Sequence, residues 1–354
     1  MINKIKDIVK NVEQSYRFNR VTKAFERRYL NVNPDLFKET IDGDLIKQYE
    51  MKWSVFGKKV ETKTFRLCYN LSGIADLNIV PENLFASVIE PRLNRYAISN
   101  FLEIKNVYNK WFRSSEHFPK AFFHKIDGIY YNNDYQIIND IDHYLSQNRL
   151  ELPVIIKASK DTYGGTDVRF IKRPEDVKIA LSEFKNLVCQ EVIKQSKFLE
   201  DINSSSINTI RTCLYRNDQG SFEVLNNSIR FGVNGSLDNE TSGGIVCNIN
   251  ENGMLHTYAV DKYANKFVEH PNTCAKFLSL KIPFYDELNQ VAIKIANELI
   301  YCNLASLDMC LDMNNNWRCI EVNLRGQTIR FAQYAGKGFF GKHTDDVIKK
   351  VRDI

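Results

Sequence analysis

Three residues near the C-terminal end of the sequence have the types and spacing of a divalent metal site: Asp308, Glu321 and Asn323. Residues 321 and 323 differ by two, so both side chains leave the same face of a strand. The asparagine-rich stretch 314–316 predicts a tight turn that brings Asp308 opposite them. Two carboxylates and one amide oxygen suit Mg²⁺, which takes its remaining ligands from water and substrate phosphates. A solvated hairpin with ordinary polar residues is the alternative.

A second group of residues, far upstream, has the types that bind phosphate. Lys157 ends the apolar run 154–156, and the polar loop 161–166 follows with the pair Gly164 and Gly165. A lysine at the end of a buried strand can meet phosphate oxygens while the backbone N–H groups of a glycine loop close over them. The same pattern also occurs in plain hairpin turns whose lysine reaches solvent.

The elements that must position these residues form a largely antiparallel sheet after residue 150. Short strand-like runs alternate there with turn residues. Helices are predicted from Pro174 and from Pro283, and the second has apolar residues at helical spacing up to Leu299. The predicted strands cover residues 152–157, 167–172, 187–193, 207–215, 222–231, 243–249, 254–260, 305–311 and 317–322.

The first hundred residues are helix-rich by pattern. Ile5, Ile8, Val9 and Val12 recur at helical spacing, and a second helix is predicted after the turn at 33–35. The opening helix is basic and amphipathic, so it suits either packing on the body of the protein or contact with an anionic membrane surface.

The composition is that of an ordinary globular protein of 354 residues, with 44% hydrophobic and 26% charged residues, which excludes disordered and collagenous classes. A formal net charge of +5 is too small to predict a nucleic-acid partner. No apolar stretch is long enough for a membrane span, and the charged residues among the first eleven lead us to expect no signal sequence. The eight cysteines have no Cys-x-x-Cys spacing, so we expect buried reduced thiols in a cytoplasmic protein, and the scattered histidines predict no zinc site.

The lysine, the glycine loop and the carboxylate hairpin occur in the order that resembles the ATP-grasp superfamily. This resemblance implies an α+β ATP-grasp fold, in which two α+β subdomains clasp ATP and Mg²⁺. It implies that Lys157 contacts the α-phosphate and that Gly164 and Gly165 form a phosphate lid. Lys105, in Glu103-Ile104-Lys105-Asn106, is the best match to the other ATP lysine, although members commonly have Asp before it.

The resemblance also assigns a hinge and domain boundaries. Gln190 would meet the adenine amino group, and the backbones of Glu191 and Ile193 would make the hinge hydrogen bonds. A plain edge strand with outward polar residues is the alternative. The expected organisation is a helix-rich region at 1–100, an N-terminal grasp subdomain at 101–195 and a C-terminal antiparallel-sheet subdomain at 196–354.

More specifically, the chain is similar to the sugar-transfer-associated ATP-grasp proteins, which are found among genes for bacterial surface polysaccharides. The motifs that carry this similarity are Ser206-Ile207-Asn208-Thr209-Ile210-Arg211, Asp238-Asn239 followed by Gly243-Gly244, and the terminal Asp308 with Glu321-Val322-Asn323.

Two arginines on predicted strands are candidate catalytic residues within this resemblance. Arg211 and Arg230 would lie on the floor of the nucleotide cleft, where guanidinium groups suit the γ-phosphate and an acyl-phosphate oxygen. Pairing with a surface acid is the alternative. Many carboxylate ligases of the superfamily have an arginine two residues before the metal aspartate, whereas this chain has Ser306, so Arg211, Arg230 or Arg325 must supply that charge.

The resemblance therefore implies an ATP-dependent carboxylate-amine ligase that releases ADP and phosphate. Its substrates would be small molecules, an amine or amino acid and a sugar-linked carboxylate. Two alternatives stay open: a sugar kinase on the same fold, and a non-catalytic nucleotide-binding partner of a glycosyltransferase.

Overall fold

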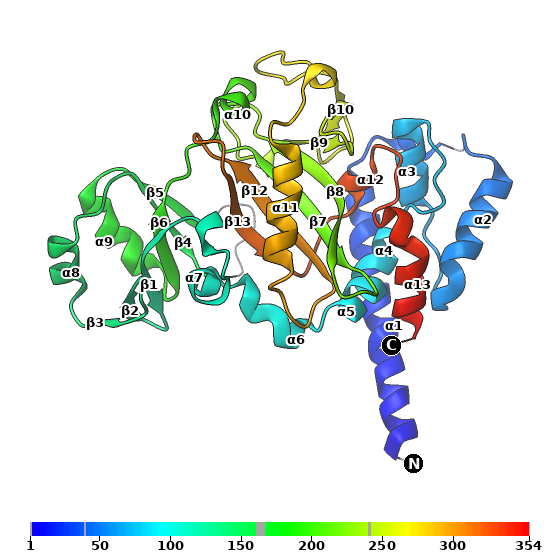
Figure 1. Cartoon of the computed structure of the whole chain (residues 1–354). Helices are drawn as coiled ribbons and strands as arrows, with labels where there is room; N and C mark the ends of the chain where they lie inside the picture. Colours follow the sequence, from blue (N-terminus) through cyan, green and yellow to red (C-terminus); the bar gives the residue numbers. More distant parts are fainter. Residues whose placement is uncertain (1, 39, 161–166, 240–241, 354) are drawn as a thin grey trace.

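The computed structural model describes residues 2–38, 40–160, 167–239 and 242–353, with side chains from residue 12 onward. Within this part of the chain, helices accompany two antiparallel sheets that lie side by side (Figure 1). The architecture is α+β, as the sequence predicts.

The smaller sheet has the strand order β3-β2-β1-β6-β4-β5, and α8 and α9 lie beside it (Figure 1). Its core forms because Phe123, Val154 and Ile156 are fully buried, and α9 adds Val177 and Leu181 to the same cluster. The elements are β1 (Ala121–Ile126), β2 (Ile129–Asn132), β3 (Ile137–Ile138), α8 (Ile141–Gln147), β4 (Val154–Ala158), β5 (Val168–Ile171), α9 (Pro174–Glu183) and β6 (Leu187–Glu191).

The larger sheet has the order β11-β10-β9-β8-β7-β12-β13. Helix α11 (Tyr285–Ala296) crosses one face of it (Figure 1), because Leu288, Ala292 and Ile295 form a buried stripe at helical spacing. The strands are β7 (Thr209–Arg216), β8 (Phe222–Phe231), β9 (Ile245–Ile249), β10 (Leu255–Val260), β11 (Lys266–Phe267), β12 (Leu304–Leu311) and β13 (Trp317–Asn323).

Helices from both ends of the chain pack on the larger sheet. Phe18 and Tyr29 of the first helix share a buried cluster with Cys213, Tyr215 and Leu304 of the sheet. The helices outside the two sheets are α1 (Ile2–Tyr29), α2 (Gly43–Trp53), α3 (Lys63–Ser72), α4 (Glu82–Leu84), α5 (Glu90–Leu93), α6 (Tyr96–Ser99), α7 (Tyr108–Trp111), α10 (Lys197–Ile202), α12 (Arg330–Gln333) and α13 (Thr344–Arg352).

One face of β7 changes from apolar to polar along its length. Cys213 and Tyr215 belong to the helix-covered cluster, whereas Thr209 and Arg211 lie four and two residues before Cys213 and therefore on the same face. The N-terminal helices thus cover the apolar end of this face, and the polar end remains beside the smaller sheet.

Several predicted elements end at other residues than the sequence pattern indicates. Strand β6, the predicted hinge strand, ends at Glu191, so Ile193 lies beyond it. Strand β9 starts only at Ile245, because Gly243 has a positive φ of 107°. Strands β1 to β3 are not predicted from the sequence at all. The expected second helix starts later than the sequence pattern indicates: a short 3₁₀ turn at Pro34–Phe37 is followed by α2, which starts where the Asp42 side chain accepts the Asp44 N–H at 2.9 Å.

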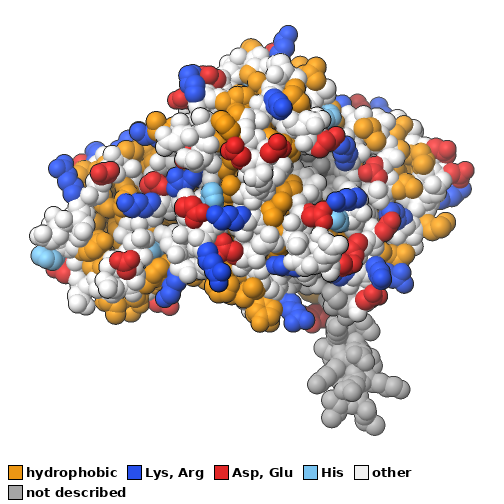
Figure 2. All heavy atoms as spheres, in the orientation of Figure 1, with side chains coloured by type: hydrophobic (Ala, Val, Ile, Leu, Met, Phe, Trp, Pro, Cys, Tyr) orange, Lys and Arg blue, Asp and Glu red, His pale blue; other side chains and the backbone are white. Residues whose placement is uncertain are grey.

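Surface and burial agree with the composition. Figure 2 shows Lys and Arg side chains interspersed with Asp and Glu over the visible face. Seven of the eight cysteines are buried and Cys274 is exposed. Among the described helices, none combines the length and the apolar character that a bilayer span requires.

Candidate active site

The hairpin of β12 and β13 brings the three predicted metal-binding residues to one face. Asp308 pairs with Glu321 across the two strands, and Ser306 pairs with Asn323. Directly opposed residues of an antiparallel pair point to the same side of the sheet. The turn forms because the Asp312 carboxylate accepts the N–H groups of residues 314 and 316, both at 2.9 Å.

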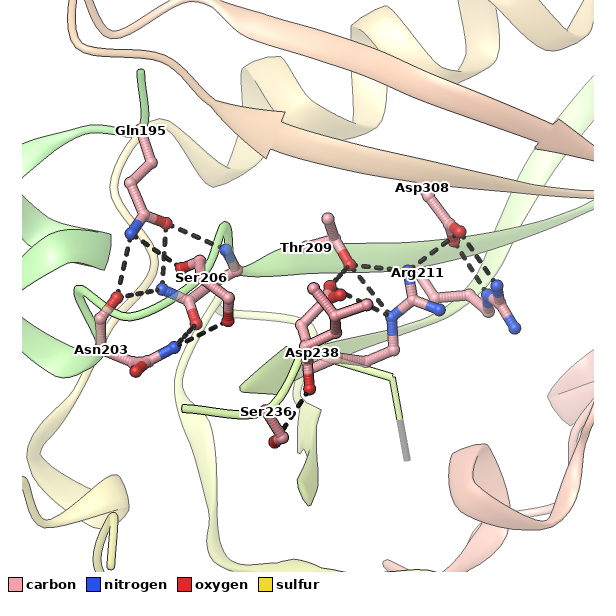
Figure 3. A network of polar contacts seen from close by, with 11 residues as sticks. Gln195, Asn203, Ser206, Thr209, Arg211, Ser236, Asp238 and Asp308 are labelled. Carbon is pink, nitrogen blue, oxygen red and sulfur yellow. Dashed lines mark hydrogen bonds and ion pairs between the residues drawn. The ribbon is translucent and has the colours of Figure 1, made fainter. Parts of the chain in front are cut away.

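Two arginines from neighbouring strands hold the Asp308 carboxylate. Nε and Nη2 of Arg211 donate to its two oxygens at 2.9 and 3.0 Å, and Nη2 of Arg230 lies 2.9 Å from Oδ2 (Figure 3). Burial alone would raise the pKa of Asp308, but the charges and hydrogen bonds of Arg211 and Arg230 outweigh it and hold this pKa well below its usual range. Asp308 is therefore an ionised carboxylate in a buried position.

Arg230 also reaches a second carboxylate through Thr209. Its Nε and Nη2 donate to the Thr209 hydroxyl at 3.0 and 2.6 Å, and that hydroxyl donates to Asp238. The Asp238 carboxylate lies 3.8 Å from Nε of Arg230. Burial raises the pKa of Asp238, while the Arg230 charge opposes that shift. Figure 3 shows this continuous polar chain from Asp238 to Asp308.

The other metal-binding candidate on the hairpin is paired with an upstream lysine. Nζ of Lys105 lies 2.6 Å from Oε1 of Glu321, and the Lys105 backbone N–H donates to Ser159 of the smaller sheet. Lys157 on β4 is buried nearby. Burial and then repulsion from Lys105 lower the pKa of Lys157 to about 7, while Glu321 opposes the shift. Two lysines associated with the smaller sheet thus meet the hairpin of the larger one.

The three predicted hinge residues do not share one environment. Gln190 is buried on β6, between β1 and β4. The Glu191 carboxylate accepts the Lys120 N–H at 2.9 Å and lies 2.5 Å from Nη2 of Arg318 on β13, so this residue links the two sheets. Ile193 lies beyond the strand and packs against the core of the larger sheet.

Three other predicted residues remain. Gly164 and Gly165 fall outside the described residues. Arg325, a candidate for the missing ligase arginine, stacks over the ring of Tyr96 at 4.8 Å from its centroid. The arginines that surround Asp308 are instead Arg211 and Arg230.

The residues present fit a magnesium ion that also binds phosphates. Among the described residues, no group of three His, Cys, Asp or Glu side chains is placed to hold a metal by itself. Two carboxylates and one asparagine are what Mg²⁺ uses when water and substrate phosphates complete its shell. Asn323 Nδ2 and Ser306 Oγ are buried and lack hydrogen-bond partners in the described part of the chain. Both atoms can therefore form hydrogen bonds with water or phosphate oxygens that bind beside Asp308.

Thr209 organises the site, although the sequence pattern does not single it out as a site residue. Its hydroxyl joins Arg230 to Asp238. Its spacing of two from Arg211 was the available signal. Asn208, the residue before Thr209, has other partners: its side chain donates to the side chain of Gln195 at 2.9 Å and to the backbone of Asn203 at 2.8 Å. This second network holds the segment that leads into β7.

The α+β fold with two antiparallel sheets is that of an ATP-grasp protein. The sequence matches the family described as sugar-transfer associated ATP-grasp over residues 85–347, and the chain belongs to this family.

Solved structures with a similar fold include three ligand-bound enzymes. N5-carboxyaminoimidazole synthetase from Staphylococcus aureus in complex with ADP has a TM-score of 0.41 and 12% identity, over 69% of this chain and 52% of that one. Biotin carboxylase from Campylobacter jejuni has a TM-score of 0.42 and 14% identity, over 72% and 48%. The ATP-grasp ligase PsnB, complexed with a minimal precursor, has a TM-score of 0.39 and 13% identity, over 71% of this chain and 62% of that one. The chain thus spans about half the length of the first two. A search of curated proteins found no match.

Proposed function

We propose that this protein is an ATP-dependent ligase that joins an amine to a carboxylate and releases ADP and phosphate. The observation that carries the proposal is the Asp308 carboxylate held ionised by the buried Arg230 and the half-buried Arg211, beside Glu321 on the same face of the hairpin. Membership of the sugar-transfer associated family supports a sugar-linked carboxylate as the acceptor, within surface polysaccharide synthesis.

In this proposal, each charged side chain has a defined task. Asp308, Glu321 and Asn323 would hold Mg²⁺, which supplies charge neutralisation to the phosphates of ATP. Lys105 and Lys157 would bind phosphate oxygens of the nucleotide, and the low pKa of Lys157 would rise when these anions approach. Gln190 and the backbones of Glu191 and Ile193 would bind the adenine.

The two arginines would act on the acceptor and on the transferred group. A carboxylate oxygen of the acceptor attacks the γ-phosphorus, ADP leaves, and an acyl phosphate forms. The amine nitrogen then attacks the acyl carbon, phosphate leaves, and the amine loses a proton. Arg211 and Arg230 would orient the negative oxygens in both steps, since phosphoryl transfer depends mainly on positioning and electrostatic stabilisation.

The test compares Glu321→Gln with wild type. ADP release is measured with ATP, Mg²⁺, uronic acids and amino acids, and MgADP binding is measured by calorimetry. We expect at least about a 10²-fold loss of rate and weaker Mg²⁺-dependent binding, because one electrostatic contact at a reaction centre is worth about this much. Glu251→Gln, which alters an exposed carboxylate paired with Lys337, is the matched control.

Wild-type turnover and binding in Glu321→Gln would contradict the assignment of the hairpin. A stable phosphorylated product formed without any amine would instead select the sugar kinase. Nucleotide binding without turnover of any substrate set would favour a non-catalytic nucleotide-binding partner of a glycosyltransferase.

A further inference from the structure

Two adjoining cavities lie where α1, α5 and the start of β12 meet. The larger has a volume of about 890 Å³ and the smaller about 390 Å³. They share Arg17, Pro91 and Arg95 in their walls, so we treat them as one feature and call them the arginine cavities. Both volumes fall in the range of small-molecule sites.

The charge in the arginine cavities is strongly unbalanced. Five arginines line them against two glutamates, which leaves an excess of positive charge before any ligand binds. The arginines are Arg17, Arg92, Arg95, Arg216 and Arg325, and the glutamates are Glu13 and Glu90.

Two of these arginines are fixed in the wall by the backbone. Arg216 donates from Nη2 to the Leu299 carbonyl and from Nη1 to the Gly220 carbonyl, both at 2.7 Å. Arg92 donates to the Val351 carbonyl at 2.9 Å. Carbonyl acceptors hold a guanidinium in place without neutralising its charge, so both residues keep the cavities positive.

The other three arginines keep donor capacity for a ligand. Arg17 makes one long hydrogen bond, at 3.4 Å, to the Ala86 carbonyl. Arg325 lies over the ring of Tyr96, which leaves its in-plane N–H groups open to an acceptor. The side chain of Arg95 has no hydrogen bond or ion pair to the described part of the protein.

The nearby acid does not cancel this charge. Burial lowers the pKa of Arg17, and repulsion from Arg325 lowers it further, while Glu90 opposes both. The Glu90 carboxyl is itself buried, which raises its pKa to about 7, and it accepts the Gln327 N–H at 3.0 Å. A carboxyl that is partly protonated near neutral pH gives weak compensation, so an anion would relieve the repulsion.

The smaller cavity begins directly after the candidate metal hairpin. Leu324 and Arg325 line it, and they follow Asn323 in the sequence. The Glu103 carboxylate fixes this segment, because it accepts the Leu324 N–H at 2.6 Å and the Tyr96 hydroxyl at 2.7 Å. The wall of the smaller cavity is therefore the direct continuation of β13.

We propose that the arginine cavities bind a phosphate or diphosphate group carried by the acceptor substrate, an inference that rests on the ligase function proposed above. Guanidinium groups pair with phosphate oxygens through two parallel hydrogen bonds, and three arginines with open donors suit a multiply charged group. The acceptor is then a phosphorylated sugar acid.

The first experiment measures binding of inorganic pyrophosphate to the full chain by calorimetry at fixed ionic strength. We expect the double variant Arg17→Gln/Arg95→Gln to bind at least 10-fold more weakly than wild type, and the exposed Arg95→Gln alone to show part of this loss. The control variant Arg113→Gln/Arg149→Gln removes two exposed charges elsewhere and should bind as wild type does. Affinity that is the same in the double variant and in wild type overturns the proposal.

The second experiment identifies the acceptor as the source of the phosphate. Glucuronic acid 1-phosphate should bind wild type at least 10-fold more tightly than glucuronic acid, and the double variant should lose this preference. Equal binding of the two sugars to wild type overturns the proposal. MgADP affinity, measured in parallel, should be unchanged in the double variant. Absence of MgADP binding to wild type would refute the proposed function. The pyrophosphate result would still show whether the arginine cavities bind a phosphate or diphosphate group.

Discussion

At the scale of single residues, two buried carboxyl groups, those of Asp308 and Glu90, have pKa values shifted in opposite directions. Asp308 is buried and ionised because two arginines donate to it. Glu90 is just as deeply buried, but mainly backbone N–H groups stabilise its charged form, and burial raises its pKa to about 7. A buried carboxyl therefore stays charged only where cations approach it directly.

The raised pKa of Glu90 predicts a pH dependence of stability. Between the usual pKa of glutamate and about 7, the folded protein holds a proton that the unfolded chain has lost. The free energy of unfolding must then fall as pH rises through this window. Glu90→Gln removes this dependence, so we expect the variant to gain stability relative to wild type between pH 5 and 8, by about 2 kcal/mol.

Urea unfolding at several pH values measures this difference. The control is Glu50→Gln, which replaces an exposed glutamate of α2. A stability difference between Glu90→Gln and wild type that is constant from pH 5 to 8 would show that Glu90 ionises at its usual pKa.

At the scale of elements, a bulge in the hairpin separates the site from the core. Asp308 pairs with Glu321, but Met309 pairs with Cys319, so Ile320 is an extra residue on β13. A bulge of this kind re-aims the side chains that follow it. Glu321 and Asn323 therefore face the polar side, while Met309 and Cys319 enter the core beneath α11.

The packing of α11 on that core predicts a large effect of one substitution. Leu288 is fully buried against the sheet. Leu288→Ala should lower the free energy of unfolding by about 2–5 kcal/mol, because the removed atoms leave a cavity in a packed layer. Leu278→Ala, at a position 64% exposed, is the control and should change stability by less than about 0.5 kcal/mol. Denaturant unfolding of both variants distinguishes them, and equal losses would contradict this account of the core.

At the scale of the whole molecule, the helices before residue 94 are part of the core that supports the site. They cover the apolar end of the face whose polar end holds Arg211 and Asp308. The family match begins only at residue 85. The earlier helices nevertheless bury Trp53, Phe65 and Leu71 in the cluster that includes Tyr215.

This shared core predicts that a chain beginning at residue 94 does not fold as a stable monomer. Removal of the helices exposes Tyr215, Leu304 and their neighbours to water, and exposed apolar patches of this kind promote association. Size-exclusion chromatography and near-ultraviolet circular dichroism measure the outcome, with residues 1–93 supplied as a separate chain for rescue. A monomeric shortened chain with the native near-ultraviolet spectrum would contradict the prediction.

Local patterns were enough to predict the strands of the larger sheet except β11, and the common face of Asp308, Glu321 and Asn323. Both depend on alternation along a strand and on turn chemistry, which neighbouring residues determine. The same reasoning misplaced the second helix, because the Asp42 side chain starts α2 only after a separate 3₁₀ turn. It also missed strands β1 to β3, of which β2 and β3 have only exposed and half-buried positions.

The sequence by itself determined the residue types of the candidate site, its likeness to a family, and which side chains of one strand share a face. Only the tertiary structure decided that Arg211 and Arg230 both meet Asp308, that Lys105 pairs with Glu321, and that further arginines line cavities beside the hairpin. Alternation is a property of neighbouring peptide units, whereas these ion pairs join residues 78 to 216 positions apart in the chain. Such partners are selected by how the sheets and helices pack, and no local pattern records that choice.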